Sequence, residues 1–155
     1  MGNRRRSREL AMQALFQIEL DGDNSSETLE LFCKHFGISK KVRSFFFRLV
    51  DGVQESLHEI DPLIEQFSEN WKMSRMSRVD RNVMRIAVYE LIYCQDIPPK
   101  VSINEAIDIG KKYGTEDSGA FVNGILDSIR LFLEKESRLD PRKAQDQPGG
   151  MGSNL

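Results

Sequence analysis

Apolar residues recur every three to four positions along most of this 155-residue chain, and no segment of useful length alternates apolar with polar residues. The first spacing is that of one helix face, whereas a half-buried strand has a period of two. The pattern therefore predicts an all-α fold of about seven helices. The expected helices cover residues 4–20, 26–36, 39–57, a segment starting at 61–62, 79–93, 102–113 and a last segment from about 118 to 133.

Turn and capping residues place the ends of the early helices. Asp21 and Gly22 close the first helix, and Gly37 ends the second. Ser39 opens the third, and the pair 61–62 (Asp-Pro) is expected to supply the cap and the first-turn proline of the fourth.

The segment 98–127 holds the densest set of local signals. Ser102 followed by Glu105 matches a capping box, and Gly114 stands where that helix should stop. A second helix then begins, with three candidate caps and an apolar stripe that starts at Phe121. The candidate caps are Thr115, Asp117 and Ser118.

Composition predicts one globular domain over residues 1–135, followed by a flexible polar tail over residues 136–155. The chain is 39% hydrophobic and 30% charged, and it has neither an apolar run of membrane-spanning length nor a hydrophobic segment of signal-peptide type, which predicts a cytoplasmic protein. Cys33 and Cys94 lack a CxxC spacing and have only His35 nearby, so we expect core cysteines and no metal site.

The small net charge of −2 conceals a strong local asymmetry. Four arginines precede the first acid, Glu9; residues 21–69 hold ten acidic against five basic residues, whereas residues 72–85 hold five basic residues and one acid. Local basicity on an acidic chain is typical of a protein with one nucleic-acid-binding face. The four arginines are Arg4, Arg5, Arg6 and Arg8.

This arginine run opposes the dipole of the helix that it starts, at a cost of about a few tenths of a kcal/mol for each exposed charge. A stable fold does not need such an arrangement. It suits a segment that is frayed when free and ordered by phosphates when bound, because the guanidinium fork matches phosphate oxygens. The alternative is a basic tail that only aids solubility.

Three stretches of the chain together resemble the NusB family of bacterial transcription antitermination factors. They are RRRSRELAMQALFQIEL (residues 4–20), RVDRNVMRIAVYEL (78–91) and VSINEAIDIGKKYGTEDSGAFVNGILD (101–127). The resemblance covers about residues 4–134 and implies two packed helical sub-bundles, over about 1–60 and 61–135. It also implies a factor that binds boxA RNA together with NusE and supports processive elongation on ribosomal RNA operons within an RNA polymerase antitermination complex.

The resemblance implies an RNA site around the arginine run and around the loop near Gly114. Rings such as Tyr113 and Phe121 can stack on bases, and the Asp117 carboxylate can accept from base or ribose donors while it repels phosphate. Without the resemblance, both rings would be interpreted as core and Asp117 as a cap. The implied RNA-binding residues are Arg4, Arg5, Arg6, Arg8, Lys100, Tyr113, Asp117 and Phe121.

Phe16 and Asp80 match family positions that face NusE, where many relatives carry Tyr and Glu. The exchange keeps the apolar area and the charge but changes the available hydrogen bonds. The alternative is that Phe16 belongs with Met12 and Leu20 to a helix buried over more than half its circumference.

The second basic cluster comprises Arg78, Arg81 and Arg85, which share a helix face. They could extend an RNA track, but the interpretation favoured for Arg78 and Arg81 is a solvated or paired role, with pairing to the acidic first half.

No catalytic motif is recognisable, so the chain is predicted to be a non-enzymatic RNA- and protein-binding module without cofactors. The alternative is an RNA-targeting helical module related to those of ribosomal RNA methyltransferases. A pure protein adaptor would leave the arginine run without a purpose.

Overall fold

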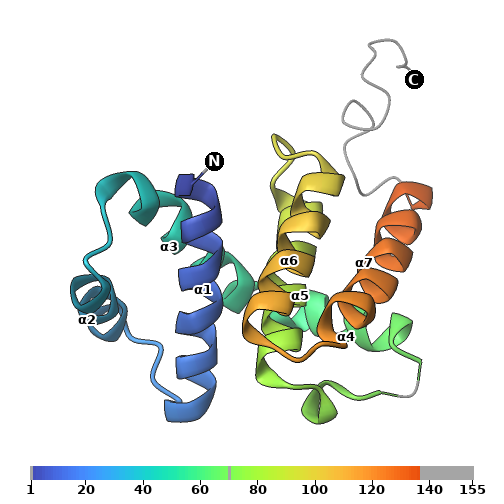
Figure 1. The fold of residues 1–155 in the computed structure, drawn as a ribbon, viewed down its shortest axis with the longest axis horizontal. Coiled ribbons are helices and arrows are strands. Elements are labelled where there is room, and N and C mark those ends of the chain that lie inside the picture. The colour runs from blue at the N-terminus through green and yellow to red at the C-terminus, as the bar shows by residue number, and fades with distance from the viewer. Residues whose placement is uncertain (1, 70, 137–155) are drawn as a thin grey trace.

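The computed structural model describes residues 2–69 and 71–136, and this part of the chain contains seven α-helices, one short 3-10 helix and no strand (Figure 1). The predicted all-α fold is confirmed. Nearly all of the predicted flexible tail lies outside the described residues. The helices are α1 (Gly2–Asp21), α2 (Ser26–Phe36), α3 (Lys40–Glu55), α4 (Leu57–Phe67), η1 (Met73–Arg75), α5 (Arg78–Tyr93), α6 (Pro99–Tyr113) and α7 (Ser118–Lys135).

The helix α5 lies at the centre and packs against α1, α3, α4, α6 and α7. Its Met84 and Leu91 side chains are fully buried, and burial of each such side chain contributes about 1.5–3 kcal/mol. Figure 1 shows α2 at one edge, α7 at the opposite edge, and α1 and α6 side by side with their N-terminal ends toward the same end of the molecule. The predicted boundary between sub-bundles, at residue 60, falls inside α4; the division into two sub-bundles stays a prediction.

The predicted ends of α1 and α2 and the predicted start of α3 agree with the structure, whereas α3 ends at Glu55 and residue 57, its predicted end, begins α4. Gly22 and Gly37 have positive φ angles of 72° and 59°, and backbone N–H groups of Gly37 and Ile38 close the end of α2. Ser39 is the N-cap residue of α3. Glycine is favoured at the two left-handed positions because a Cβ would crowd the backbone there.

The prediction that Asp61 and Pro62 start the fourth helix is wrong. The helix α4 begins at Leu57, directly after Ser56, and Pro62 lies inside it. The Asp61 carboxylate does not cap the helix; its oxygens accept hydrogen bonds from Arg85 of α5, both at 2.8 Å.

The capping-box interpretation of Ser102 and Glu105 is also wrong. The helix α6 begins one turn earlier, at Pro99, whose fixed φ suits a first helical position. Ser102 is buried and donates its hydroxyl hydrogen bond to Glu90 Oε1 over 2.6 Å, while the Glu105 carboxylate accepts from Arg5. Both side chains connect helices.

Gly114 ends α6 as predicted, and a close approach explains the glycine. A Cβ at this position would lie 2.4 Å from Ser118 Oγ and 2.7 Å from the carbonyl oxygen of Gly110. Ser118 Oγ accepts from the backbone N–H of Thr115 at 3.0 Å, which keeps the turn into α7 tight. Of the three candidate caps, Asp117 occupies the N-cap position, but its side chain makes no capping hydrogen bond.

Candidate nucleic-acid interface

The four N-terminal arginines lie in three different environments. Arg8 is only 4% exposed, and its guanidinium donates to both Glu90 oxygens, at 2.7 and 2.9 Å. Burial lowers its pKa, but the hydrogen bonds and the charge of Glu90 outweigh burial, so the pKa is raised. The prediction that a stable fold has no need of the arginine run is therefore wrong for Arg8, which joins α1 to α5.

Arg5 is held by two carboxylates of α6. It donates to Glu105 at 2.5 and 2.7 Å and to Asp108 at 3.0 Å. The hydrogen bond to Glu105 raises the pKa of Arg5, and the same contact lowers the pKa of Glu105. A phosphate would have to compete with these carboxylates for the Arg5 fork.

Arg4 and Arg6 are the two arginines of the run with about half of the side chain exposed, at 48% and 46%. Arg4 lies 3.5 Å from Asp96 and places its guanidinium 4.3 Å from the centroid of the Phe45 ring. Arg6 reaches Glu9 only at 3.9 Å. Such loose, exposed pairs contribute little, so both cations can exchange their partners for phosphate oxygens.

A hollow of 520 Å³ lies between the start of α1 and the start of α6. Arg4, Arg5 and Arg8 line it from one side, and residues 96–98 and Val101 from the other. Lys100, in the first turn of α6, is exposed and forms no ion pair with the described residues. We call the surface formed by Arg4, Arg5, Arg6 and Lys100 the arginine end.

The remaining candidate residues gather near the other end of α6. Phe16 and Tyr113 line one hollow, of 350 Å³, and Asp80, Asp117 and Phe121 line a second, of 320 Å³. In Figure 1 the end of α6, the start of α7 and the start of α5 lie at the end of the molecule opposite the N-terminus. We call the surface formed by Phe16, Asp80, Tyr113, Asp117 and Phe121 the aromatic end.

The apolar strip of α1 runs from the core to the surface. Met12 is 2% exposed, Phe16 is partly buried, and Leu20 is 52% exposed. The interpretation as a buried strip therefore holds for Met12 and is wrong for Leu20. Phe16 shares its hollow with Tyr113 and presents part of its ring there.

The two ends are connected by polar contacts between α1 and α6. Besides the Arg5–Glu105 pair, Lys112 donates to the buried Glu9 carboxylate at 3.0 Å and lies 5.3 Å from the Tyr113 ring centroid. The hydrogen bond to Glu9 raises the pKa of Lys112. The earlier residue of α1, Arg5, pairs with the earlier residue of α6, Glu105, and the later residue, Glu9, pairs with the later one, Lys112. The two helices therefore run parallel.

Similarity to known proteins assigns this arrangement to a family. The NusB family model matches residues 5–130, which is most of the chain. The chain belongs to the NusB family.

Several proteins named transcription antitermination protein NusB are close in sequence. The chain is 54% identical over 143 residues to that of Desulfatibacillum aliphaticivorans, which covers 92% of this chain and 100% of the relative. It is 49% identical over 139 residues to that of Myxococcus xanthus, covering 87% of this chain and 99% of the relative. NusB-family membership makes the chain a transcription antitermination factor and confirms, through its relatives, that it is not an enzyme.

Two solved structures show the same fold. T. maritima NusB is 46% identical, with a TM-score of 0.74 over 83% of this chain and 90% of that one. A chain from a crystal structure of the antitermination factors NusB and NusE in complex with double-stranded RNA is 31% identical, with a TM-score of 0.77 over 85% of this chain and 98% of that one.

The second basic cluster of this NusB-family chain is paired, as the favoured interpretation held. Glu19 of α1 accepts from Arg81 at 2.9 Å and from Arg85 at 2.8 Å, and Arg78 lies 3.8 Å away. Burial raises the pKa of Glu19, but the hydrogen bonds from Arg81 and Arg85 outweigh it and leave the pKa lowered. These ion pairs connect the C-terminal end of α1 to α5.

Sequence reasoning missed Trp71 and Arg75, which line the hollow of Asp80, Asp117 and Phe121. Neither belongs to an apolar stripe or to a recognised motif. The available signal was composition, because Trp71 is the only tryptophan in the chain and sits in a connecting segment where core packing does not require it.

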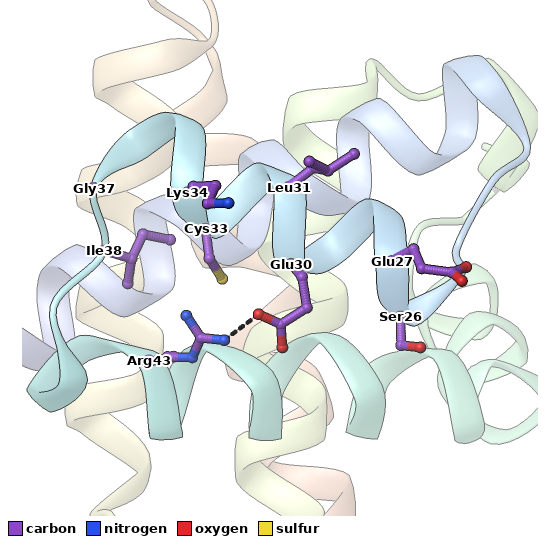
Figure 2. Close-up of a pocket in the computed structure, with 9 residues that line it drawn as sticks. All are labelled: Ser26, Glu27, Glu30, Leu31, Cys33, Lys34, Gly37, Ile38 and Arg43. Atoms are coloured by element: carbon purple, nitrogen blue, oxygen red, sulfur yellow. Dashed lines mark hydrogen bonds and ion pairs between the residues drawn. The ribbon is translucent and has the colours of Figure 1, made fainter.

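Another hollow, of 750 Å³, lies between α2 and α3 (Figure 2). It contains the ion pair between Arg43 and Glu30 and the thiol of Cys33, and none of the predicted site residues lines it. Cys33 and Cys94 are both buried, as predicted, and burial raises the pKa of Cys94 to about 11. No described helix is long and apolar enough to cross a membrane.

Proposed function

We propose that this chain is a cytoplasmic antitermination factor that binds boxA-type single-stranded RNA together with NusE and supports processive elongation on ribosomal RNA operons. The observation that carries the RNA part is the arginine end, where Arg4 lines an open hollow and Arg6 and Lys100, at the starts of α1 and α6, are further exposed cations. Exposed cations beside an open surface supply the backbone contacts that single-stranded nucleic acid requires.

The aromatic end supplies the second element of such a site. Tyr113 and Phe121 are partly buried, so each ring is anchored while part of it reaches the surface. Anchored rings lose little entropy when a base stacks on them. RNA that follows the parallel pair α1 and α6 would bring backbone to the arginine end and bases to the aromatic end.

NusE would bind at Phe16 and Asp80. Phe16 offers a partly exposed ring beside Tyr113, and Asp80 lies in the first turn of α5, close to Val79 of the same hollow. Contact of NusE with these residues would put protein and RNA on adjoining surfaces. The solved complex of NusB with NusE and RNA supports this assembly.

The experiment is an RNA-binding titration at several salt concentrations, with boxA-like and scrambled RNA, with and without NusE. The double variant Arg4→Ala/Arg6→Ala should weaken binding, and the log–log salt slope should flatten by about 0.7 for each phosphate that the protein no longer neutralises. Lys34→Ala is the control, because Lys34 is an exposed cation without an ion pair among the described residues and lies on α2, at the edge of the molecule away from α6 (Figure 1). Equal affinity and slope for the double variant and the control would exclude an RNA role for the arginine end.

Two variants test the aromatic end in the same titration. Phe121→Leu keeps apolar volume but removes the ring face, so a stacking residue should lose roughly 1–3 kcal/mol of RNA binding. Asp117→Asn removes a negative charge without a described ion-pair partner and should tighten RNA binding where phosphate passes. If both variants bind RNA as the parent does, the segment 115–124 is only architecture.

A further inference from the structure

The guanidinium of Arg5 has one edge that is filled and a second edge that is only half filled. Its Nε and Nη2 groups donate to Glu105 at 2.5 and 2.7 Å, which fills the edge formed by these two nitrogens. Along the edge formed by Nη1 and Nη2, only Nη2 has a partner within the described residues, Asp108 Oδ2 at 3.0 Å. Arginine carries five N–H groups in a fixed plane, and the Arg5 side chain is partly exposed, so this second edge can still take an anion.

The two carboxylates around Arg5 differ in how firmly they are held. Glu105 is 20% exposed and lies 3.4 Å from Nη1 of the buried Arg8, which gives it a second cation. The Asp108 side chain is 52% exposed, and its bond to Arg5 is its only hydrogen bond or ion pair within the described residues. An exposed ion pair contributes little, because water hydrates the released carboxylate. Asp108 is therefore the partner that Arg5 can exchange at small cost.

We propose that Asp108 is an internal competitor of the RNA backbone: a phosphate of the bound RNA takes the Nη1–Nη2 edge of Arg5 from Asp108, while Glu105 keeps the Nε–Nη2 edge. The proposal rests on the proposed function, because it concerns an RNA contact at the arginine end. Phosphate oxygens match two parallel N–H groups as carboxylate oxygens do, so one anion can replace the other on the same edge.

In this arrangement Asp108 lowers the affinity of the arginine end for RNA in two ways. Its bond to Arg5 must break before the phosphate can use both nitrogens of the edge, and its negative charge stays near the bound phosphate and repels it. Both effects act on the RNA backbone, which carries no sequence information. Asp108 therefore weakens binding to every RNA by the same factor and leaves the choice of sequence to other contacts.

The test measures binding by the anisotropy of a labelled boxA-like RNA and of a scrambled RNA, at several salt concentrations. Asp108→Asn should tighten binding of both RNAs by about two- to fivefold, the range expected for one exposed ion pair. Asp127→Asn is the matched control, because Asp127 is equally exposed and also accepts from an arginine, Arg130, but lies on α7. The control should leave the affinity unchanged.

A double-mutant cycle shows whether Asp108 acts through Arg5. Arg5→Ala should weaken binding and flatten the log–log salt slope by about 0.7 for the lost phosphate contact. In that background Asp108→Asn should have almost no effect, because the edge for which the two anions compete is gone. If thermal unfolding shows that Arg5→Ala does not fold, Arg5→Gln takes its place in the cycle, since its amide can still donate to Glu105.

An unchanged affinity in Asp108→Asn would overturn the proposal while the proposed function stands. An equal gain in the Arg5→Ala background, or from Asp127→Asn, would also overturn it, since the effect would then be one of overall charge. A gain for the boxA-like RNA alone would overturn it by assigning Asp108 to a base contact. Absence of RNA binding by the parent protein would overturn the proposed function as well.

Discussion

Arg8→Ala should strongly destabilise the fold because it leaves the buried Glu90 carboxylate without its cationic partner. Glu90 is 1% exposed, and its carboxylate would keep only the Ser102 hydroxyl, at 2.6 Å, after losing both guanidinium hydrogen bonds. Removing one partner of a buried ion pair costs about 3–5 kcal/mol. That is a large part of the roughly 5–15 kcal/mol by which a domain is stable.

The assay is urea unfolding of the parent, Arg8→Ala and the double variant Arg8→Met/Glu90→Leu. The double variant should regain most of the lost stability, because no buried charge remains unpaired. Arg6→Ala is the surface control and should change stability by less than about 0.5 kcal/mol. A loss below about 1 kcal/mol for Arg8→Ala would refute the buried pair.

The double variant also separates structure from RNA binding at Arg8. It removes the Arg8 charge in a folded protein while Arg4 and Arg6 remain. RNA affinity equal to that of the parent would show that Arg8 acts through the fold, and a lower affinity with a flatter salt slope would keep Arg8 among the RNA contacts.

Three further predictions concern substitutions at single positions. Gly114→Ala should cost about 1–3 kcal/mol in thermal unfolding because its Cβ would meet Ser118 Oγ, whereas Gly124→Ala, with open space around the new Cβ, should be neutral or stabilising; equal effects would contradict the tight turn. Phe16→Asp should weaken NusE binding at least tenfold while Leu31→Asp on α2 does not, and a melted Phe16 variant would place the ring in the core instead. The pKa of Glu19 is lower in the folded protein than its unfolded value near 4.5, so the ionised carboxylate stabilises the fold above about pH 4.5, and this stabilisation is lost as the pH falls through the native pKa. Glu19→Gln should therefore have a lower free energy of unfolding than the parent at neutral pH, and the difference should narrow in acid. A difference that does not change with pH would contradict the prediction.

Much of the helical scaffold was predictable from local chemistry. Gly37 and Ser39 mark helix ends because their own backbone geometry or side chain suits those positions, and the apolar period identified α5. The errors arose where a local signal competed with a distant partner. Ser102 matches a helix cap in sequence, but its hydroxyl donates a hydrogen bond to Glu90 of another helix. Pro62 suits a first helical turn, but it lies inside a helix that begins at Leu57.

The candidate site was harder to predict for the same reason. The sequence does not distinguish the arginines of the run from one another, yet Arg8 is buried against Glu90 while Arg6 remains half exposed. The identity of the neighbour decides between these environments, and that neighbour is 82 residues away for Arg8. Trp71 lay outside every periodic stripe, so only the folded chain brings it to Phe121.

The parallel course of α1 and α6 also sets the distance between the arginine end and the aromatic end, and so a minimum length for an RNA that contacts both. The helix α6 has 15 residues, so its two ends lie about 22 Å apart at 1.5 Å per residue. A strand with the roughly 3.4 Å spacing of stacked nucleotides needs about seven nucleotides to cover that length. In the proposed binding mode, shorter oligonucleotides would reach the arginine end or the aromatic end but not both at once. Affinity should therefore rise in a step, rather than gradually, as the RNA is lengthened past this limit.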